Sequence, residues 1–196
     1  MKRSAKRDIP PSITVIMLFF IGFTTGFSVK GWVNKPIPAS HATASAHPKE
    51  SIEVCFTPNK TCQSKILDSI EGAKKSIFVQ AYSFTDHDIA TALTAAALRG
   101  VEVKVLLDRS NQTHKHSAKN ILLDNDVPLR FDAPQGIAHN KIMIIDESTV
   151  ITGSYNFSAA AYKRNTENLL TIIDPSLAKS YLQNWHARWR VSPENP

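Results

Sequence analysis

One pattern in the last third of the chain constrains its fold more than any other feature. It sets six residues at fixed distances, His139-x-Lys141-x4-Asp146-x6-Gly153-Ser154-x-Asn156, and it occurs once in the 196 residues. The run at 142–145 is Ile-Met-Ile-Ile, and such a short, apolar, β-branched run predicts a buried strand. A returning strand is expected at 149–152, followed by a short helix at 158–163. The pattern therefore predicts a sheet with polar side chains where strands begin and end.

The residue types in this pattern suit chemistry on a phosphate diester. His139 and Lys141 are two residues apart, so on a strand both would project from the same face. The imidazole can act as a nucleophile, and the ammonium offers positive charge where the phosphoryl oxygens gain negative charge. Ser154 and Asn156 lie where strand gives way to helix, and small polar side chains with free backbone amides form a phosphate cradle there.

The spacing resembles the HKD motif of the phospholipase D superfamily, and the chain around it is similar to that superfamily's small single-motif bacterial endonucleases. The similarity extends from about residue 52 to residue 189 and includes the segments Ala81-Tyr82-Ser83-Phe84-Thr85, Arg99-Gly100-Val101-Glu102-Val103, Asn165-Thr166-Glu167-Asn168 and Trp185-His186-Ala187-Arg188-Trp189. It implies an α/β catalytic domain at 51–192, with a mixed sheet flanked by helices on both faces and a single HKD motif per chain.

The apolar patterning agrees with an α/β fold. Further strands are expected at 52–56, 76–84, 101–107, 129–131 and 169–173, and helices at 64–73, 86–99, 117–123 and 176–190. Gly100 ends the second of these helices. Alternating strands and helices imply a sheet covered on both faces.

The resemblance implies a role for each residue of the motif. His139 corresponds to the histidine that forms a phosphohistidine or, in the partner motif, protonates the leaving oxygen. Lys141 and Asn156 correspond to phosphate ligands, and Ser154 lines the same pocket.

Two acidic residues complete the expected catalytic set. Asp146 is the aspartate of the motif and resembles an organiser of the site rather than a proton carrier. Glu167 resembles the acid that hydrogen-bonds the second nitrogen of the histidine, which would set its tautomer and support the imidazolium. Plainer interpretations stay open, because Asp146 and Gly153 suit ordinary turns and Glu167 could be an exposed surface acid.

The single occurrence of the motif predicts an assembly. A double displacement through phosphohistidine needs one histidine to attack and another to protonate the departing oxygen. None of His87, His114, His116 and His186 lies in a second H-x-K pattern. The second histidine is therefore expected from a second chain, in a homodimer with a shared active site on its two-fold axis. The segment 114–116 is either a solvated turn or a substrate-facing loop.

No metal and no cofactor are expected. The sequence lacks H-E-x-x-H, a C-x-x-C pair and a dense carboxylate cluster near His139. Lysine, asparagine and imidazolium would supply the charge and hydrogen bonds that a metal supplies elsewhere. Activity should therefore survive a chelator.

The N-terminus predicts export. Residues 1–7 are basic, and residues 9–29 are uncharged and largely apolar, as in a signal peptide or signal anchor at 1–34. The apolar run is near the minimum length that spans a bilayer, and small-residue cleavage sites appear only at 42–46, so retention and cleavage both stay open. A flexible linker is expected at 35–50. The protein is expected to be periplasmic or secreted, and anchored in the inner membrane by residues 9–29 if the signal is retained.

Net charge does not indicate a partner for the folded domain. The formal charge is +6, but residues 1–46 hold six Lys and Arg against one Asp. The remainder holds seventeen Lys and Arg against sixteen Asp and Glu. A nucleic-acid-binding surface would have to come from local clusters such as 114–119 and 163–164.

Cys55 and Cys62 are the only cysteines. In an oxidising compartment they could form a disulfide between the first strand and the first helix, and two free buried thiols are the alternative.

Three functions are compatible with the sequence. The first is a metal-independent phosphodiesterase that acts as an exported endonuclease on DNA, or alternatively on RNA. The second is a phospholipase D that releases phospholipid headgroups, because the chain could be held at a membrane. The third is a catalytically silent envelope or nucleic-acid-binding protein, and the intact motif argues against it.

Overall fold

The computed structural model describes residues 50–58 and 61–193. Its elements, in chain order, are β1 (Ser51–Phe56), α1 (Thr61–Gly72), β2 (Ser76–Ala81), α2 (His87–Leu98), β3 (Glu102–Asp108), the 3-10 helix η1 (Arg109–Gln112), α3 (Lys119–Leu123), β4 (Leu129–Asp132), β5 (Lys141–Ile145), β6 (Thr149–Gly153), α4 (Ala159–Lys163), β7 (Asn168–Ile173) and α5 (Pro175–Val191).

The described strands form one mixed sheet in the order β1-β7-β6-β5-β2-β3-β4. Strands β2, β3 and β4 run parallel, and every other neighbouring pair is antiparallel. As a result β2, β3, β4 and β6 end, and β5 and β7 begin, at the same edge of the sheet. We call it the His139 edge. It carries the connections 82–86, 109–118, 133–140 and 154–167, of which the second contains η1 and the fourth contains α4.

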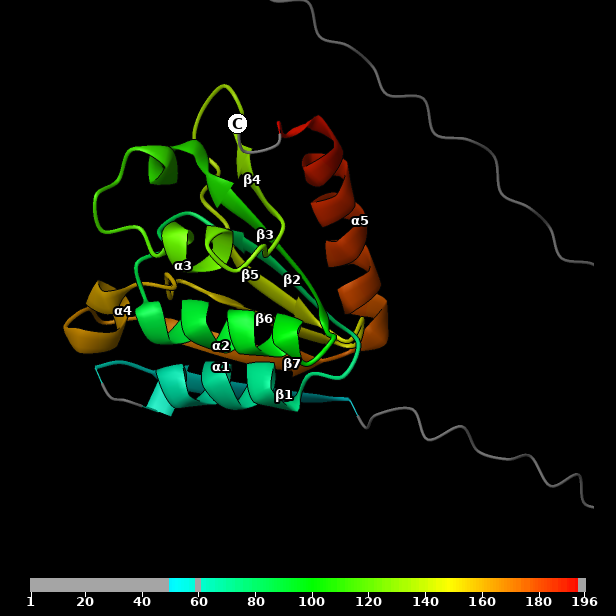
Figure 1. The fold of residues 1–196 in the computed structure, drawn as a ribbon. Helices are drawn as coiled ribbons and strands as arrows, with labels where there is room; N and C mark the ends of the chain where they lie inside the picture. The colour runs from blue at the N-terminus through cyan, green and yellow to red at the C-terminus, as the bar shows by residue number, and fades with distance from the viewer. Residues whose placement is uncertain (1–49, 59–60, 194–196) are drawn as a thin grey trace, which may run out of the picture. The chain divides into compact units, whose positions relative to one another are not determined.

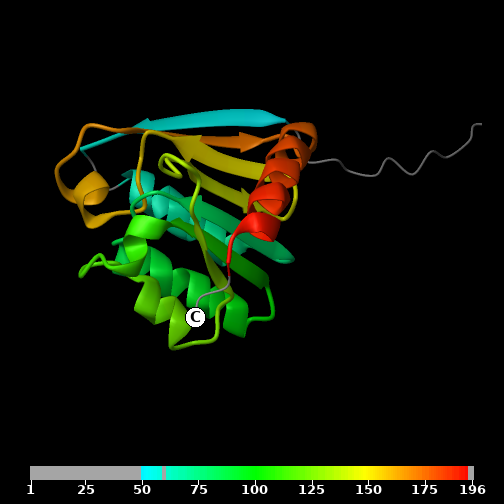
Figure 2. The same ribbon diagram turned by 90° about the horizontal axis from the view of Figure 1, so that it is seen from above.

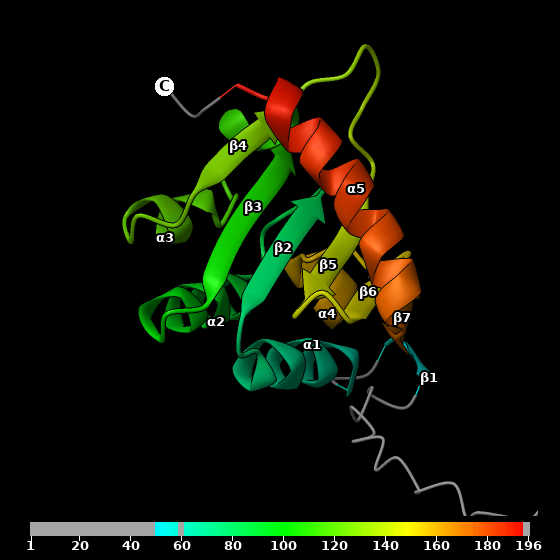
Figure 3. The same ribbon diagram turned by 90° about the vertical axis from the view of Figure 1, so that its right-hand side faces the viewer.

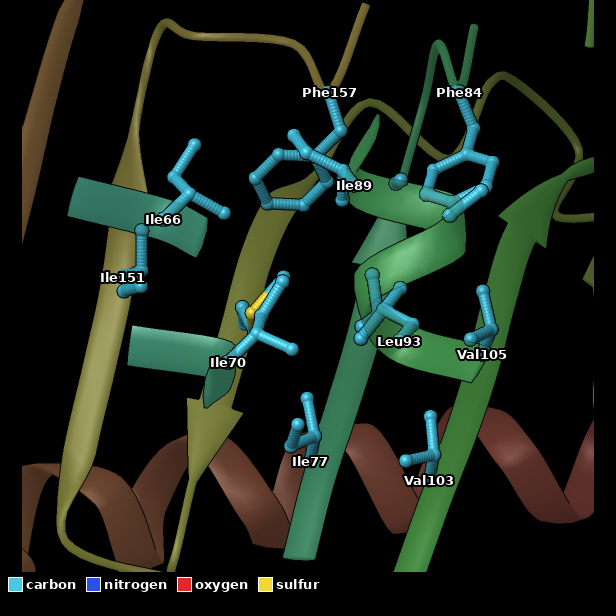
Figure 4. Packing of buried hydrophobic residues seen from close by; sticks show 14 of the residues in the cluster. Ile66, Ile70, Ile77, Phe84, Ile89, Leu93, Val103, Val105, Ile151 and Phe157 are labelled. Atoms are coloured by element: carbon cyan, nitrogen blue, oxygen red, sulfur yellow. The ribbon is translucent and has the colours of Figure 1, made fainter. Parts of the chain in front are cut away.

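Helices cover both faces of the sheet, as expected from the sequence. Helices α1, α2 and α3 lie on one face, and α5 crosses the other (Figures 1 and 3). Helix α4 lies apart from α5, with the strands between them (Figure 2). The larger core lies under α1 and α2, where their side chains meet those of the strands (Figure 4): Ile66, Ile70, Ile89 and Leu93 pack with Ile77, Val103, Val105 and Ile151.

The long helix α5 is fixed to its face by apolar packing and by polar contacts. Trp185 packs on Phe78, with ring centroids 4.9 Å apart, and its indole nitrogen donates to the Val79 carbonyl at 2.9 Å. Arg188 forms an ion pair with Asp132, whose carboxylate is buried. These contacts tie α5 to β2 and to the outermost strand β4.

Several predicted boundaries differ from the structure by one to three residues, and two of the differences at the His139 edge affect the site. The strand expected at 76–84 ends at Ala81, because the chain turns away there and the Tyr82 amide donates to the Asn140 carbonyl at 2.8 Å. The motif strand begins at Lys141, so His139 lies in the loop before it. The strand-alternation argument for His139 and Lys141 therefore does not apply.

The structure confirms the disulfide between Cys55 of β1 and Cys62 of α1. The leader at 1–34 and nearly all of the linker at 35–50 lie outside the described residues. Among the helices that the structure describes, none combines the length and the apolar character needed to cross a membrane.

Candidate active site

His139 lies exposed on a loop that is held on both sides of it. On one side, the Ala138 amide donates to the Asp108 carboxylate at 2.7 Å. On the other, the Asn140 carbonyl accepts from the Tyr82 amide at 2.8 Å. The Tyr82 ring also packs against the imidazole, with centroids 4.6 Å apart. The histidine therefore presents an exposed ring, with Tyr82 on one side, from a fixed backbone.

Asp108 ends β3 and is only 2 % exposed. Burial alone would raise the pKa of its carboxyl, but hydrogen bonds from Ser110 and from the Ala138 amide outweigh burial and hold that pKa below the ordinary value. A charged acceptor makes stronger hydrogen bonds than a neutral one. Asp108 therefore connects β3 firmly to the histidine loop.

Lys141 is the buried cation of the site. The residue is the first of β5 and is 8 % exposed, and its Nζ donates to the His139 carbonyl at 2.7 Å. Nζ also lies 5.1 Å from the centre of the Tyr82 ring. Burial lowers the pKa of Lys141, and the negative charge of Glu167 partly opposes that effect. A cation that is largely shielded from solvent interacts strongly with a phosphoryl oxygen.

The turn after β6 needs glycine at position 153. Gly153 has a φ of +142°, and a Cβ there would lie 2.4 Å from the Asn168 carbonyl oxygen. That same oxygen accepts from the Ser154 and Tyr155 amides, at 3.1 and 3.2 Å. The close approach of β6 and β7 places Ser154 at the His139 edge.

Asn156 follows on the same turn and is half-buried. Its side-chain oxygen has no hydrogen-bond partner among the described residues. Rotating the amide by 180° would present its two N–H donors at that point. Asn156 can therefore bind an added ligand without giving up a hydrogen bond of its side-chain oxygen.

Glu167 contacts Ser154 and Asn165 rather than His139. One carboxylate oxygen accepts from the Ser154 hydroxyl at 2.6 Å, and the other accepts from the Asn165 amide group at 2.9 Å. Among the residues that the structure describes, these are the side-chain partners of Glu167, so the expected hydrogen bond from His139 is not formed. The acid acts on Lys141 through its charge instead.

Asp146 is the one member of the motif that lies away from the others. It follows the far end of β5, roughly 16 Å along the strand from Lys141. Its carboxylate accepts from the backbone amides of Lys74, Lys75 and Ser76, at 2.7 to 3.1 Å. Burial would raise the pKa of Asp146, but these amides hold it below its ordinary value. Its place among the catalytic residues is not supported, whereas the organising role fits, because it fixes the start of β2.

Sequence reasoning missed three residues that shape the site. Asp108 and Tyr82 hold the histidine loop, and Thr57 holds the backbone of Glu167. The position of Asp108 at the end of an apolar strand was a usable signal. Nothing local marks Thr57, because its partners lie more than 100 residues away.

In the described part of the chain, no group of three or more His, Cys, Asp or Glu side chains is placed to hold a metal ion. The arrangement offers an exposed imidazole, a buried ammonium, a serine hydroxyl and an asparagine amide at one edge of the sheet. Together these groups can bind a phosphodiester and attack it.

Comparisons with known proteins agree with this chemistry. Residues 66–189 match a family described as cardiolipin synthase, PLD-like domain. A protein named phospholipase D from Rickettsia conorii is 42% identical over 193 residues, which is 94% of this chain and 96% of the relative.

Two solved structures share the fold. The phospholipase D family member Nuc from Salmonella typhimurium has a TM-score of 0.72 and 40% identity, and the match covers 75% of this chain and 99% of Nuc. NucT from Helicobacter pylori has a TM-score of 0.68 and 25% identity, with 75% and 100% covered. The chain, which brings His139, Lys141 and Asn156 to one edge of a mixed sheet, belongs to the phospholipase D superfamily and is a phosphodiesterase of that superfamily.

Proposed function

We propose that this protein is a metal-independent phosphodiesterase that works through a phosphohistidine on His139, and that it is an exported endonuclease that hydrolyses DNA, with RNA as the alternative nucleic acid. The observation that carries the proposal is the exposed imidazole of His139 on a fixed loop beside the buried ammonium of Lys141. The resemblance to single-motif endonucleases names the substrate class.

The reaction needs two histidines. In the first step a ring nitrogen of His139 attacks phosphorus, an N–P bond forms, and the P–O bond to the leaving oxygen breaks as that oxygen takes a proton from the second histidine. In the second step water attacks phosphorus and returns a proton to the second histidine, and the N–P bond breaks. Lys141 and Asn156 bind the phosphoryl oxygens in both steps.

A homodimer with a shared active site would supply the second histidine. Alternate residues of the edge strand β1 are exposed and apolar: Ile52 by 71%, Val54 by 51% and Phe56 by 61%. Phe56 pairs with Asn168 of β7, next to Glu167. A second copy that covered this apolar strip would therefore lie beside the site, which lacks one histidine.

Two observations support export. The apolar stretch 9–29 follows a basic start, and the disulfide between Cys55 and Cys62 suits an oxidising compartment. If residues 9–29 are retained, they would also make the membrane a partner of the protein.

A phospholipase D activity is the second candidate. The rickettsial relative carries that name, and Ile137, two residues before His139, is 58% exposed, as suits contact with a lipid surface. The two candidates share their chemistry and differ in substrate.

One experiment separates them. The full chain, His139→Ala and the control His186→Ala, which changes an exposed histidine of α5 outside the motif, are given plasmid DNA, RNA and phospholipid vesicles in EDTA. Nucleic-acid cleavage that is lost only in His139→Ala supports the proposal. Headgroup release alone supports the second candidate, and no reaction with any substrate refutes both.

Mixing chains tests the shared site. Equal amounts of wild type and His139→Ala, refolded together, should retain about a quarter of the activity of the same total amount of wild type, because only wild-type homodimers hold two histidines. Retention of about half would show that each chain works alone.

A further inference from the structure

We propose that a pocket beside the active site, between α2, α4 and the loop 113–118, binds the nucleotide next to the scissile phosphate and so selects a polynucleotide over a lipid headgroup. The proposal rests on the nuclease function proposed above and adds a second binding site to it.

The pocket unites the two basic clusters of the sequence. It has a volume of about 430 Å³ and is lined by Gln63, Thr85, Asp86, His87, Asp88, His116, Ala159, Tyr162 and Lys163. His116 belongs to the cluster 114–119, and Lys163 belongs to the cluster 163–164. Neither cluster by itself is strong evidence for a binding site, but the fold places one residue from each on the wall of the same pocket.

The pocket is close to the active site along two segments of the chain. Tyr82, which packs on His139, lies three residues before Thr85 on its wall, and Asn156 lies three residues before Ala159. Three extended residues span at most about 10 Å. The two segments are joined where the Thr85 amide donates to the Phe157 carbonyl at 2.9 Å. A strand bound at His139 can therefore reach the pocket with its next nucleotide.

The pocket wall has free cationic and aromatic groups. Lys163 is exposed and has no ion-pair partner in the described ranges, and His116 is exposed beside the ring of His114. Tyr162 adds an aromatic ring. Aromatic rings that stack on bases, together with cations that meet phosphates, are the means by which proteins bind single strands.

The two carboxylates of the pocket are already engaged. Asp86 caps α2 through the Asp88 and Ile89 amides and accepts from Gln63 at 2.7 Å. Asp88 receives a longer hydrogen bond from the same Gln63 nitrogen, at 3.4 Å. Asp88 is exposed and can also accept from an exocyclic amino group of a base. A nucleotide matches this mixture of groups, with its phosphate at Lys163 and its base between the rings.

The test compares neighbouring charges. In the full chain, Lys163→Gln removes the charge inside the pocket, and Arg164→Gln removes the same charge from the next exposed residue, which does not line the pocket. The substrates are bis(4-nitrophenyl) phosphate, which is too short to reach the pocket, single-stranded oligonucleotides of increasing length, and phosphatidylglycerol vesicles.

We expect Lys163→Gln to lower kcat/KM on the longer oligonucleotides by about two- to fivefold, the value of an exposed ion pair. The salt dependence of log(kcat/KM) should become shallower by about 0.7, which corresponds to one phosphate contact on a single strand. Cleavage of bis(4-nitrophenyl) phosphate should not change. His116→Gln should add to the loss, and Arg164→Gln should stay close to wild type.

The outcomes separate the two proposals. If wild type cleaves oligonucleotides but Lys163→Gln and Arg164→Gln behave alike, the pocket proposal is wrong and the nuclease function stands. If Lys163→Gln lowers only vesicle hydrolysis, the pocket serves a lipid and the proposal is overturned. If wild type cleaves bis(4-nitrophenyl) phosphate but no nucleic acid, the nuclease function fails and the pocket proposal fails with it.

Discussion

Thr57→Val tests how the acid of the site is held. The Thr57 hydroxyl donates to the Asn165 carbonyl and accepts from the Glu167 amide, both at 2.8 Å, and the residue is 5% exposed. Valine has nearly the same shape but makes neither bond, so a carbonyl and an amide lose their partner. Each such loss costs about 1–3 kcal/mol when the group is buried. Because Asn165 and Glu167 are only half-buried, we expect a total near the lower end, about 2–4 kcal/mol.

The variant should still fold, because a domain of this size has a free energy of unfolding of about 5–15 kcal/mol. Its Tm should fall by roughly 5–15 °C. The carboxylate of Glu167 should lose its fixed position beside Ser154 and its effect on Lys141. We expect kcat on bis(4-nitrophenyl) phosphate to fall about tenfold, which corresponds to about 1.4 kcal/mol in the barrier.

Thr57→Ser is the matched control, because it keeps both hydrogen bonds and loses one methyl group, worth about 1 kcal/mol. Its kcat should stay within about twofold of wild type. Denaturant titration and kcat, both measured where each variant is folded, separate stability from activity. Equal kcat for Thr57→Val and Thr57→Ser would refute the argument that the hydroxyl positions Glu167.

Three further outcomes follow from the site. Gly153→Ala should lower the free energy of unfolding, measured by chemical denaturation, by at least about 2 kcal/mol, because φ is +142° and the new Cβ would lie 2.4 Å from a main-chain oxygen. Gly136→Ala is the control, because it has open space around it and should lower the free energy of unfolding much less. Equal losses for the two variants would contradict the clash. Because burial lowers the pKa of Lys141 and Glu167 opposes that effect, Glu167→Gln should move the alkaline limb of the kcat profile to lower pH, and an unmoved limb would show that the two charges do not interact. The pKa of Asp146 is lowered in the fold, so its charged form stabilises the fold above about pH 4, and that contribution is lost as pH falls through the folded-state pKa. Asp146→Asn should therefore be less stable than wild type by about 1–3 kcal/mol at pH 7. This difference in the free energy of unfolding should close in acid, and a difference that persists there would refute the linkage.

Much of the fold was predictable because its signals are local. The apolar run 142–145 and its return at 149–152 became β5 and β6, and Asp86 begins the alanine-rich helix α2. Alternation of strands and helices was enough to predict a sheet covered on both faces, and the family resemblance implied that the sheet is mixed. The end of β2 was wrong by three residues, because apolar and aromatic residues continue to Phe84 while the Tyr82 amide already binds the histidine loop.

The sequence by itself indicated the chemistry, because the types of His139, Lys141 and Asn156 suit attack on a phosphodiester and their spacing resembles the HKD motif. Only the tertiary structure decided how those groups are held. In the tertiary structure Asp146 lies at the far end of β5, and the Glu167 carboxylate contacts Ser154. Those results depend on which loops meet at each end of the strands. The physical reason is that hydrogen bonds between residues far apart in the sequence leave no periodic trace along the chain, as in the 70–72 residues between Asp146 and its partners and the more than 100 between Thr57 and its partners.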